Sequence, residues 1–367
     1  MIAHKAHLVS PAFWKGKRVF LTGHTGFKGS WISQWLCDMG AELRGYSTDP
    51  EWHIAPKGSS RLFDELGLAD KMDHIPGDVR DRAHLTEALR AFTPEIVIHM
   101  AAQPLVRLSY REPVETYETN VMGTVNLLAA CQNLPGLRTI VVVSSDKCYE
   151  NREQIWGYRE SDPMGGHDPY SNSKGCTELV TAAFRSSFFS PARHDDHGVV
   201  LCSGRAGNVI GGGDWSLDRL IPDVFRARAE GQEVVIRNPQ ATRPWQHVID
   251  PVAGYLRLAE QSYETPVEAS NGWNFGPSET MTVSVGELMV MLEETLPDGL
   301  RWRIETLTDQ PHEARLLKLD CTAAQKFLHW HPSFDMAQTI RMVTDWYGNP
   351  DTDTRRALVA QQLAEVT

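Results

Sequence analysis

The sequence lacks long apolar runs. No continuous apolar stretch approaches the ~20 residues that a membrane-spanning helix needs, and the longest, around 96–102 and 140–144, have the length of strands. The N-terminal residues contain no continuous apolar segment of the kind found in secretory signals. We therefore expect a cytoplasmic protein that does not bind a membrane.

Paired cysteine motifs and an excess of basic residues are also missing. The six cysteines are scattered along the 367 residues without a CxxC pair or the spacing of metal ligands, so we expect buried thiols and no metal site. With 36 Lys and Arg against 47 Asp and Glu, the net charge is −11. This charge argues against a nucleic-acid-binding protein. A phosphate-bearing ligand must then be bound by a helix N-terminus or by single arginines.

The first half of the chain alternates short apolar runs with helical patterns. We expect strands at 18–22, 42–46, just before Pro76, 96–100, 139–144 and 199–202, and helices at 29–39, 80–92, 113–131 and 170–189. This spacing predicts an α/β fold, with a Rossmann-type, doubly wound parallel sheet covered by helices on both faces.

After about Arg205, glycines and prolines separate shorter elements, which indicates a smaller α+β lobe in the C-terminal half. We expect residues 1–205 to form the first domain, with 241–268 returning to it. Residues 206–240 and 269–367 are assigned to the second domain.

A glycine-rich loop, GHTGFKG at 23–29, lies between the first expected strand and the first expected helix. Glycines there allow a tight turn and a close approach of the backbone to a pyrophosphate, and the helix N-terminus supplies free N–H groups. The loop indicates a dinucleotide cofactor, with these ligands: Gly23, Thr25, Gly26, Phe27, Lys28 and Gly29.

The residues after the next two strands bear on the rest of that cofactor. Asp49 lies 20 residues beyond Gly29, where a ribose-binding acid is expected, but it stands just before Pro50, at or beyond the end of the expected strand. NAD is favoured over NADP, although this element supports the choice only weakly. Arg44 lies within the expected strand and cannot be assumed to bind a 2′-phosphate. Asp78 and Val79 are placed to meet the adenine ring.

Tyr170 and Lys174 form a YxxxK pattern on an expected helix. Residues four apart share one helix face, so the phenol and the ammonium can point into one cleft. The ammonium, with a cationic nicotinamide nearby, would lower the pKa of the tyrosine, which then takes a proton from a substrate alcohol. Such a pattern alone is more often a solvated helix face, but here Ser145 ends a strand upstream of it.

The glycine loop, the strand-end serine and YxxxK together resemble the extended short-chain dehydrogenase/reductase family. The resemblance covers nearly the whole chain and includes HMAAQ at 99–103 and NVMGT at 120–124. It implies that Ser145 hydrogen-bonds the substrate hydroxyl, while His99 is as readily a packed strand residue and is not interpreted as catalytic. It also implies a homodimer, or a tetramer, built on the helices at 113–131 and 170–189. The further cofactor contacts that it implies are Ala101, Ala102, Gln103, Asn120, Tyr170 and Lys174.

The residues after Ser145 distinguish groups within this family. A simple nucleotide-sugar epimerase has small residues there, whereas Asp146 and Lys147 would support β-elimination beside a C4 ketone. An Asp-Lys pair, in place of Asp-Glu, resembles the sugar-nucleotide 4,6-dehydratases that act on CDP-glucose. It implies Asp146 as the acid, Lys147 as the base and CDP-glucose as the small-molecule substrate, on a route to deoxysugars of bacterial surface polysaccharides such as O-antigen. A surface salt bridge is the alternative for the pair.

Four segments of the second half strengthen this resemblance: RAGNVIG at 205–211, RLIP at 219–222, RPWQHV at 243–248 and PHEAR at 311–315. Arg243 is suited to a bidentate contact with phosphate, although it could be an exposed turn residue. His247 and His312 are also compatible with structural roles, which we favour. The implied substrate contacts are Asn208, Arg219, Leu220, Arg243 and His312.

By this resemblance the first domain binds NAD and the second binds the sugar nucleotide. An epimerase and a dehydratase for another nucleotide sugar remain alternatives. A non-catalytic NAD sensor is a third, but such a protein would not need Ser145, Tyr170 and Lys174 together.

Overall fold

The computed structural model describes residues 9–48, 61–305 and 316–367. Its centre is a seven-stranded sheet of parallel strands in the order β10-β6-β5-β4-β1-β2-β3, which confirms the expected Rossmann-type fold. In chain order the strands are β1 (Arg18–Thr22), β2 (Glu42–Ser47), β3 (Asp73–Pro76), β4 (Ile96–His99), β5 (Thr139–Val143), β6 (Val200–Ala206) and β10 (Gly272–Phe275).

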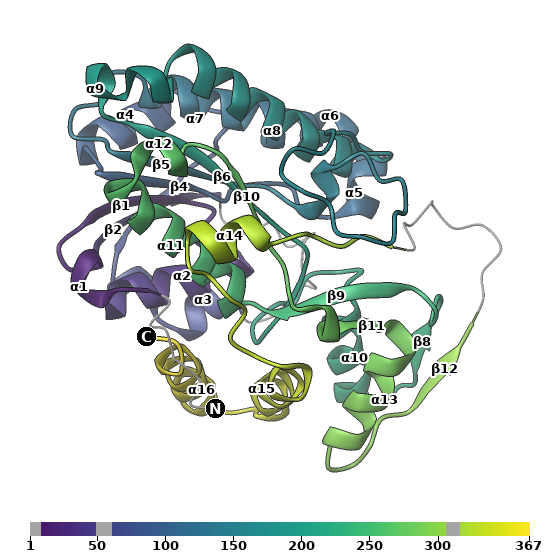
Figure 1. Cartoon of the computed structure of the whole chain (residues 1–367). Helices are drawn as coiled ribbons and strands as arrows, with labels where there is room; N and C mark the ends of the chain where they lie inside the picture. Colours follow the sequence, from purple (N-terminus) through teal and green to yellow (C-terminus); the bar gives the residue numbers. More distant parts are fainter. Residues whose placement is uncertain (1–8, 49–60, 306–315) are drawn as a thin grey trace.

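Helices cover both faces of this sheet (Figure 1). The central strands are mostly apolar because both of their faces are buried, as in β5, which has no exposed residue. One face is covered by α4 (Arg82–Phe92), α7 (Gly123–Cys131) and α8 (Pro169–Ser187). The other is covered by α2 (Phe27–Asp38) and α11 (Ile249–Glu264).

The helix expected at 113–131 contains a π-helical turn at Glu118–Met122, between α6 (Pro113–Tyr117) and α7. Such turns disturb the regular hydrogen bonding of a helix and are frequent at functional sites. Periodicity alone did not predict the turn, because the apolar positions continue through it.

A smaller lobe contains two short sheets, with strand orders β11-β9-β7 and β12-β8. Its elements are β7 (Asn208–Ile210), α10 (Leu220–Ala229), β8 (Val234–Ile236), β9 (Thr242–His247), β11 (Thr282–Ser284), α13 (Val285–Thr295) and β12 (Trp302–Ile304). Helix α11 then returns to the large sheet, but β9, which also lies within the segment 241–268 expected to return, belongs to the smaller lobe. The chain also returns there with β10, although 269–367 was expected to belong to the second domain. A four-residue buried strand does not reveal which sheet it joins.

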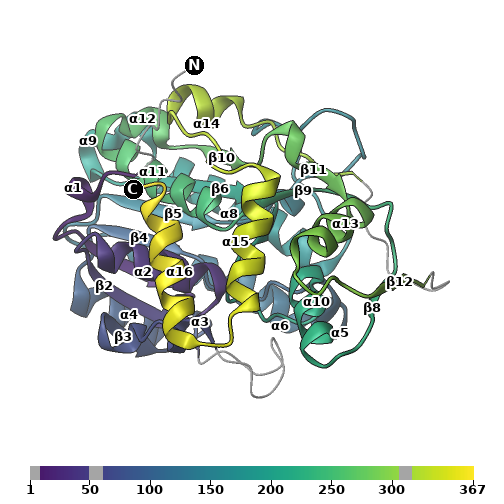
Figure 2. The same cartoon turned by 90° about the horizontal axis from the view of Figure 1, so that it is seen from below.

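The last helix of the chain differs from the expected assignment in the same way, whereas the helix before it also packs on α13 and β9 of the smaller lobe. Helices α15 (Met336–Gly348) and α16 (Thr352–Ala364) lie side by side beneath the large sheet (Figure 2). Trp35 of α2 donates its indole N–H to Thr367 Oγ1 at 3.0 Å, and Arg355 of α16 pairs with Glu65 at 3.0 Å. The end of the chain therefore packs against the first domain.

Short helices complete the described chain. They are α1 (Pro11–Trp14), α3 (Leu62–Glu65), α5 (Val106–Arg111), α9 (His194–His197), α12 (Pro266–Ala269) and α14 (Thr322–Phe327), with 3₁₀ turns at Leu68–Asp70, Asp146–Cys148, Pro191–Arg193 and Glu279–Met281. Among the helices in the described ranges, none is both long and apolar enough to cross a bilayer. All six cysteines are free thiols, and the described part of the chain holds no cluster of three or more His, Cys, Asp or Glu suited to a metal.

Asp250, in the first turn of α11, is a fully buried carboxyl group with a perturbed pKa. Burial raises its pKa to about 7, although a hydrogen bond from the Ser333 N–H to Oδ1 at 2.7 Å opposes this. An unfolded Asp titrates near ~4, so folding favours the protonated form. The resulting stability is fully present below pH ~4 and is lost as the pH rises towards 7.

We expect Asp250→Asn, which mimics the protonated carboxyl group, to raise the melting temperature at pH 8 by about 2–4 °C or more and to change it little near pH 4. Thermal unfolding followed by circular dichroism at both pH values measures this. Asp345→Asn, which changes an exposed carboxylate of α15, is the control. An equal effect of Asp250→Asn at the two pH values would show that the carboxyl group is not protonated by burial.

Candidate active site

The predicted site residues gather at the carboxyl edge of the large sheet, where the loops after β1, β4 and β5 meet the start of α8. Ligands of doubly wound folds bind at this edge, because parallel strands all end there. The glycine loop follows β1, Ser145 follows β5, and Tyr170 lies in the first turn of α8.

The glycines of the loop are required by close backbone contacts. Gly23 has φ +75°, and a Cβ on it would lie 2.7 Å from the backbone nitrogen of Ala101. A Cβ on Gly29 would lie 2.1 Å from the carbonyl oxygen of Gly23. Both positions exclude a side chain, so the loop folds tightly against the end of β4 and the first turn of α2.

The N-terminus of α2 is open towards the edge of the sheet. Gly26 is its N-cap, no side chain caps it, and Ser30 donates the first intrahelical hydrogen bond, to Gly26 at 2.8 Å. A Cβ on Gly26 would meet only the Gly23 carbonyl, at 3.4 Å, so Gly26 faces open space. Exposed N–H groups at the positive end of a helix fit a pyrophosphate, so these residues suit a dinucleotide.

Lys28, in the first turn of α2, is close to the groups expected to do chemistry. Burial lowers its pKa to about 7; the charges of Arg219 and Lys174 lower it as well, while Asp146 and Asp214 raise it. The sequence placed Lys28 only among the cofactor ligands. The structure adds that its amine lies within electrostatic range of Asp146 and Lys174.

Ser145, Asp146 and Lys147 form a tight turn after β5. Ser145 Oγ donates to Asp146 Oδ1 at 2.9 Å and accepts from the Lys147 N–H at 3.3 Å. Asp146 is buried, and burial raises its pKa, against the opposing effects of Lys147, Ser145 and Lys28. A Cβ on Gly207 would come within 3.0 Å of Asp146 Oδ2, so the glycine of the RAGNVIG segment makes room for this carboxyl group. The raised pKa suits Asp146 to donate a proton.

Local sequence positions Tyr170 and Lys174 against that turn. Asp168 caps α8 by accepting the Ser171 N–H at 2.9 Å, and Pro169 occupies the first turn, so the helix begins just before Tyr170. Next to Lys174, a Cβ on Gly175 would lie 3.1 Å from the carbonyl oxygen of Cys148. The glycine therefore lets α8 approach the turn that carries Asp146.

The pKa of Tyr170 is set by burial when no cofactor is bound. Burial raises it to about 12, against a Ser145 hydrogen bond and the charge of Arg219. The lowering expected from the Lys174 ammonium together with a cationic nicotinamide stays a prediction. Burial also lowers the pKa of Lys174 to about 8, while Glu178 opposes this. Desolvation of a buried phenol thus outweighs the charges that the chain itself supplies.

The segment after β4 is held by hydrogen bonds within the protein. Asn120, in the π-helical turn, accepts the Gln103 N–H at 2.7 Å and donates to the Gln103 carbonyl at 3.1 Å and to Ser173 Oγ at 2.8 Å. It therefore fixes the loop of Ala101, Ala102 and Gln103 against α8, and its direct contact with a cofactor stays a prediction. His99 bonds Thr22 and Thr124 through its two ring nitrogens, and burial lowers its pKa to about 3, as befits a packed strand residue.

The other predicted cofactor residues surround the end of β2 and β3. Thr25 Oγ1 bonds Ser47 Oγ at 2.9 Å, and Asp78 pairs with Arg80 at 2.6 Å within its own turn. Val79 is buried against Gly123 of α7. Asp49 lies outside the described residues, so the ribose contact remains a prediction.

Predicted substrate residues approach from the smaller lobe. Arg219 precedes α10 and pairs with Asp214 at 2.9 Å, and its charge acts on both Tyr170 and Lys28. Asn208 begins β7 and Leu220 begins α10, and both are half-buried.

Arg243 lies on β9 and is buried, not an exposed turn residue. Pro244, the next residue, faces Gly207 and so borders the space around Asp146. His247 is fully buried between the rings of Trp31 and Phe334, as a structural histidine would be. His312 lies outside the described ranges.

Comparison with known proteins then establishes the relationship. A family model described as GDP-mannose 4,6 dehydratase matches residues 20–343. The chain belongs to this dehydratase family. It is also 51% identical, over 340 residues that cover 93% of each chain, to a curated CDP-glucose 4,6-dehydratase of Salmonella typhimurium.

Solved structures that share the fold are less similar to this chain in sequence than the Salmonella enzyme is. The epimerase Mth375 of Methanothermobacter thermautotrophicus superimposes with a TM-score of 0.77 at 21% identity, over 98% of each chain. The protein MoeE5, in complex with UDP-glucose and NAD, has a TM-score of 0.73 at 24% identity, over 93% of this chain and 99% of its own. At these identities the likeness shows the fold alone.

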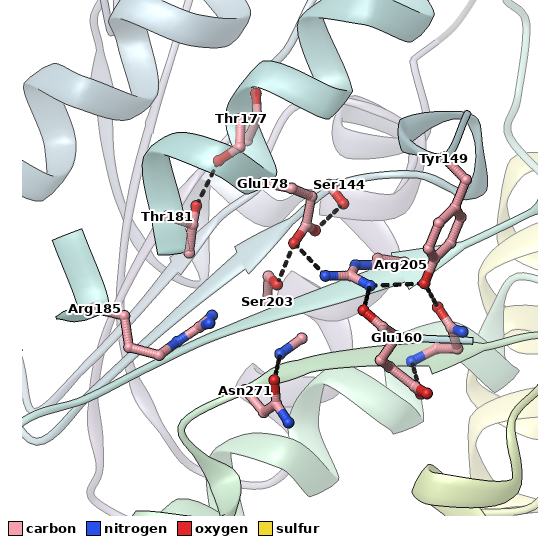
Figure 3. Close-up of polar contacts among 12 residues, drawn as sticks. Ser144, Tyr149, Glu160, Thr177, Glu178, Thr181, Arg185, Ser203, Arg205 and Asn271 are labelled. Atoms are coloured by element: carbon pink, nitrogen blue, oxygen red, sulfur yellow. Dashed lines mark hydrogen bonds and ion pairs between the residues drawn. The ribbon is translucent and has the colours of Figure 1, made fainter. Parts of the chain in front are cut away.

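Sequence reasoning missed two charged residues of this dehydratase-family site. Glu178 lies one turn after Lys174 on α8, and Arg205 on β6 pairs with it at 2.8 Å. Figure 3 shows the pair between Ser144 and Tyr149, which flank the turn after β5. The i, i+4 spacing from Lys174 could have indicated Glu178. Arg205 entered the sequence analysis only as the first residue of the RAGNVIG segment.

Proposed function

We propose that the protein is a CDP-glucose 4,6-dehydratase, which converts CDP-glucose into CDP-4-dehydro-6-deoxy-D-glucose and water. The observation that carries this proposal is the buried acid Asp146, followed by Lys147, between the strand-end Ser145 and Tyr170. Epimerisation needs no such acid. The choice of cytidine is supported by the 51% identity to the Salmonella enzyme.

NAD supplies the hydride acceptor of the first step and the hydride donor of the last, and its positive ring favours the phenolate of Tyr170. The open N-terminus of α2 would hold its pyrophosphate. Arg44 is engaged elsewhere, since its guanidinium bonds Asp73 at 2.6 Å and stacks on Phe92 at 4.8 Å. This supports NAD over NADP, because that arginine is not placed to meet a 2′-phosphate.

In the first step Tyr170 takes the proton of the C4 hydroxyl while the C4 hydrogen leaves as hydride. Ser145 hydrogen-bonds the same hydroxyl, and Lys174 stabilises the phenolate. The product of this step is a ketone at C4, which acidifies the proton at C5.

In the second step Lys147 removes the C5 proton and Asp146 protonates the departing C6 hydroxyl, so that water leaves. Burial raises the pKa of Asp146, which favours the protonated carboxyl group that this step needs. Hydride then returns to C6 and a proton to C5, so the reaction has no net redox change.

Turnover of a panel of sugar nucleotides tests the assignment. We expect kcat/KM for CDP-glucose to exceed that for dTDP-glucose, UDP-glucose, GDP-glucose and GDP-mannose by at least about tenfold. A 6-deoxy-4-keto product from a different nucleotide at equal or better efficiency would overturn the substrate but keep the dehydratase chemistry. A C4 epimer as the product would replace the proposal by the epimerase alternative.

Arg243 is proposed to bind the substrate diphosphate, in ground state and transition state alike. Arg243→Ala is therefore expected to raise KM for CDP-glucose about tenfold or more with little change in kcat. Arg243→Lys keeps the charge but loses the planar guanidinium, so its KM for CDP-glucose should lie between those of the wild type and Arg243→Ala. Steady-state kinetics measure both values. An unchanged KM in the alanine variant would assign Arg243 a structural role.

We further propose that the protein is a homodimer that pairs through α6, the π-helical turn and α8. These elements contact one another, and each exposes a large apolar side chain, namely Val114, Met122 and Leu179. Light scattering should give twice the mass of one chain, and Leu179→Glu should give a monomer. A wild-type mass of one chain, or an unchanged mass in the variant, would contradict this interface.

A further inference from the structure

A buried ion pair, Glu178–Arg205, lies between Ser144 and Tyr149, the two residues that flank the catalytic turn, Ser145–Cys148 (Figure 3). Arg205 Nη2 is 2.8 Å from Glu178 Oε2, and the two side chains are 7% and 3% exposed. Taking two charges out of water is costly unless further hydrogen bonds satisfy them. The hydrogen-bond partners of Glu178 and Arg205 therefore show which parts of the chain the ion pair connects.

Glu178 binds the end of the strand that carries the catalytic turn. Its Oε1 accepts a hydrogen bond from Ser144 Oγ, and its Oε2 accepts one from Ser203 Oγ at 2.8 Å. Ser144 directly precedes Ser145. The carboxylate thus links α8, with Tyr170 and Lys174, to β5, with Ser145 and Asp146.

Arg205 binds the other end of the same turn. Its Nη1 donates to Tyr149 OH at 2.7 Å and to the Glu160 carbonyl at 3.2 Å. Tyr149 OH in turn donates to Asn274 Oδ1 at 2.7 Å. Tyr149 directly follows the turn Asp146–Cys148, and Ser144 precedes its N-cap Ser145. The ion pair therefore anchors the chain on both sides of the turn, through Ser144 and Tyr149.

Burial by itself would raise the pKa of Glu178, but the charge of Arg205 and the hydrogen bonds from Arg205, Ser144 and Ser203 lower it overall. Glu178 is therefore an anion inside the protein. It lies four residues after Lys174, on the same helix face, where its charge favours the protonated ammonium.

Besides Glu178, only Cys148 among the described groups raises the pKa of Lys174 by its charge, and its effect is the smaller of the two. Burial keeps Cys148, in the 3₁₀ turn, a neutral thiol, and it keeps His99 of β4 neutral with a pKa of about 3. Lys28 of α2 adds positive character with a pKa of about 7, and Tyr170 is a neutral phenol in the chain alone. Burial also favours the neutral form of Asp146.

We propose that Glu178 is a positioning residue of this active site: it fastens the helix of Tyr170 and Lys174 to the turn of Ser145 and Asp146, and its charge keeps Lys174 protonated. This inference rests on the proposed function, since it assumes that Tyr170 and Lys174 perform the C4 oxidation. Glu178 thereby makes two contributions that different variants can separate: its negative charge near Lys174, and the hydrogen bonds that fix the helix against the turn.

The rate of nicotinamide reduction in a single turnover, measured from pH 6 to pH 10, tests the charge. In the wild type this rate should fall at high pH as Lys174 loses its proton, near its pKa of about 8. Glu178→Gln removes the charge but keeps the shape, so we expect this alkaline limb to move to lower pH by about one unit. At pH 8, where about half of Lys174 is protonated in the wild type and about a tenth in the variant, the rate should then be about fivefold lower.

Glu178→Asp tests the geometry. It keeps the charge on a shorter side chain, so we expect the alkaline limb to stay in place while the rate falls at every pH. Thr181→Val is the matched control. Thr181 lies on the next turn of the same helix face and is fully buried, and the hydrogen bond that its hydroxyl donates within the described chain is to the Thr177 carbonyl at 2.8 Å. This variant should change neither the position of the alkaline limb nor the rate of nicotinamide reduction. Thermal unfolding of each variant reports its stability separately.

An alkaline limb that stays in place in Glu178→Gln, whatever the loss of stability, would make Glu178 a purely structural residue. If that variant does not fold, a shifted limb or an unchanged rate in Glu178→Asp would overturn the inference equally. A wild type that forms neither the 4-keto sugar nor the 6-deoxy product would instead overturn the proposed function.

Discussion

Tyr170→Phe is expected to abolish the first step, so that no reduced nicotinamide forms when CDP-glucose is added. The phenylalanine ring fills the same space but has no oxygen to accept the proton of the C4 hydroxyl. General acid–base groups typically contribute 10²–10⁴-fold, so the rate should fall by about that factor or more. Absorbance of the reduced nicotinamide in a single turnover and the yield of 6-deoxy product measure the two ends of the reaction.

Tyr263→Phe provides the matched control for this substitution. Tyr263 lies on α11, away from the catalytic turn, and its buried hydroxyl has no hydrogen-bond partner in the described part of the chain. It should leave both rates unchanged. If Tyr170→Phe keeps the rate of nicotinamide reduction within about tenfold of the wild type, Tyr170 is not the base of the oxidation.

Asp146→Asn and Lys147→Ala are expected to spare the oxidation and to stop the elimination. The first variant cannot protonate the departing hydroxyl, and the second lacks the amine that removes the C5 proton. Both should therefore accumulate reduced nicotinamide on the enzyme, together with a 4-keto sugar that keeps its C6 hydroxyl. The yield of 6-deoxy product should fall by about 10²-fold or more, which mass spectrometry of the sugar nucleotides measures.

Lys326→Ala, which removes an exposed lysine of α14, should behave as the wild type in the same assay. The wild type returns its hydride within each turnover and should show no net reduction. Release of 6-deoxy product at the wild-type rate by the Lys147 variant would show that another group removes the C5 proton. Lys28, with a pKa of about 7 beside Asp146, would then be the first residue to test.

Much of the first domain could be predicted from the sequence, because its signals are local. The apolar run at 18–22 is β1 with the expected bounds, and the start of α8 follows from Asp168 and Pro169 just before Tyr170. The glycine loop lies where expected because its glycines are demanded by backbone contacts. Strand spacing was sufficient for the doubly wound sheet.

Features that depend on long-range packing could not be predicted. The short strand β10 joins the large sheet beside β6, and α16 packs on α3, far away in sequence. The Glu178–Arg205 pair depends on the contact of a helix with a strand. The raised pKa of Tyr170 depends on the depth of burial, which the YxxxK pattern does not reveal.

The most direct test of the dehydratase mechanism is the position of deuterium in the product when the wild type converts CDP-glucose in heavy water. Removal of the C5 proton by a side chain that exchanges with solvent, followed by return of the substrate's own C4 hydrogen to C6, predicts deuterium at C5 and none in the C6 methyl group. Proton and deuterium NMR of the product distinguish the two positions. A product with no deuterium at C5, or with deuterium in the C6 methyl group, would contradict the account.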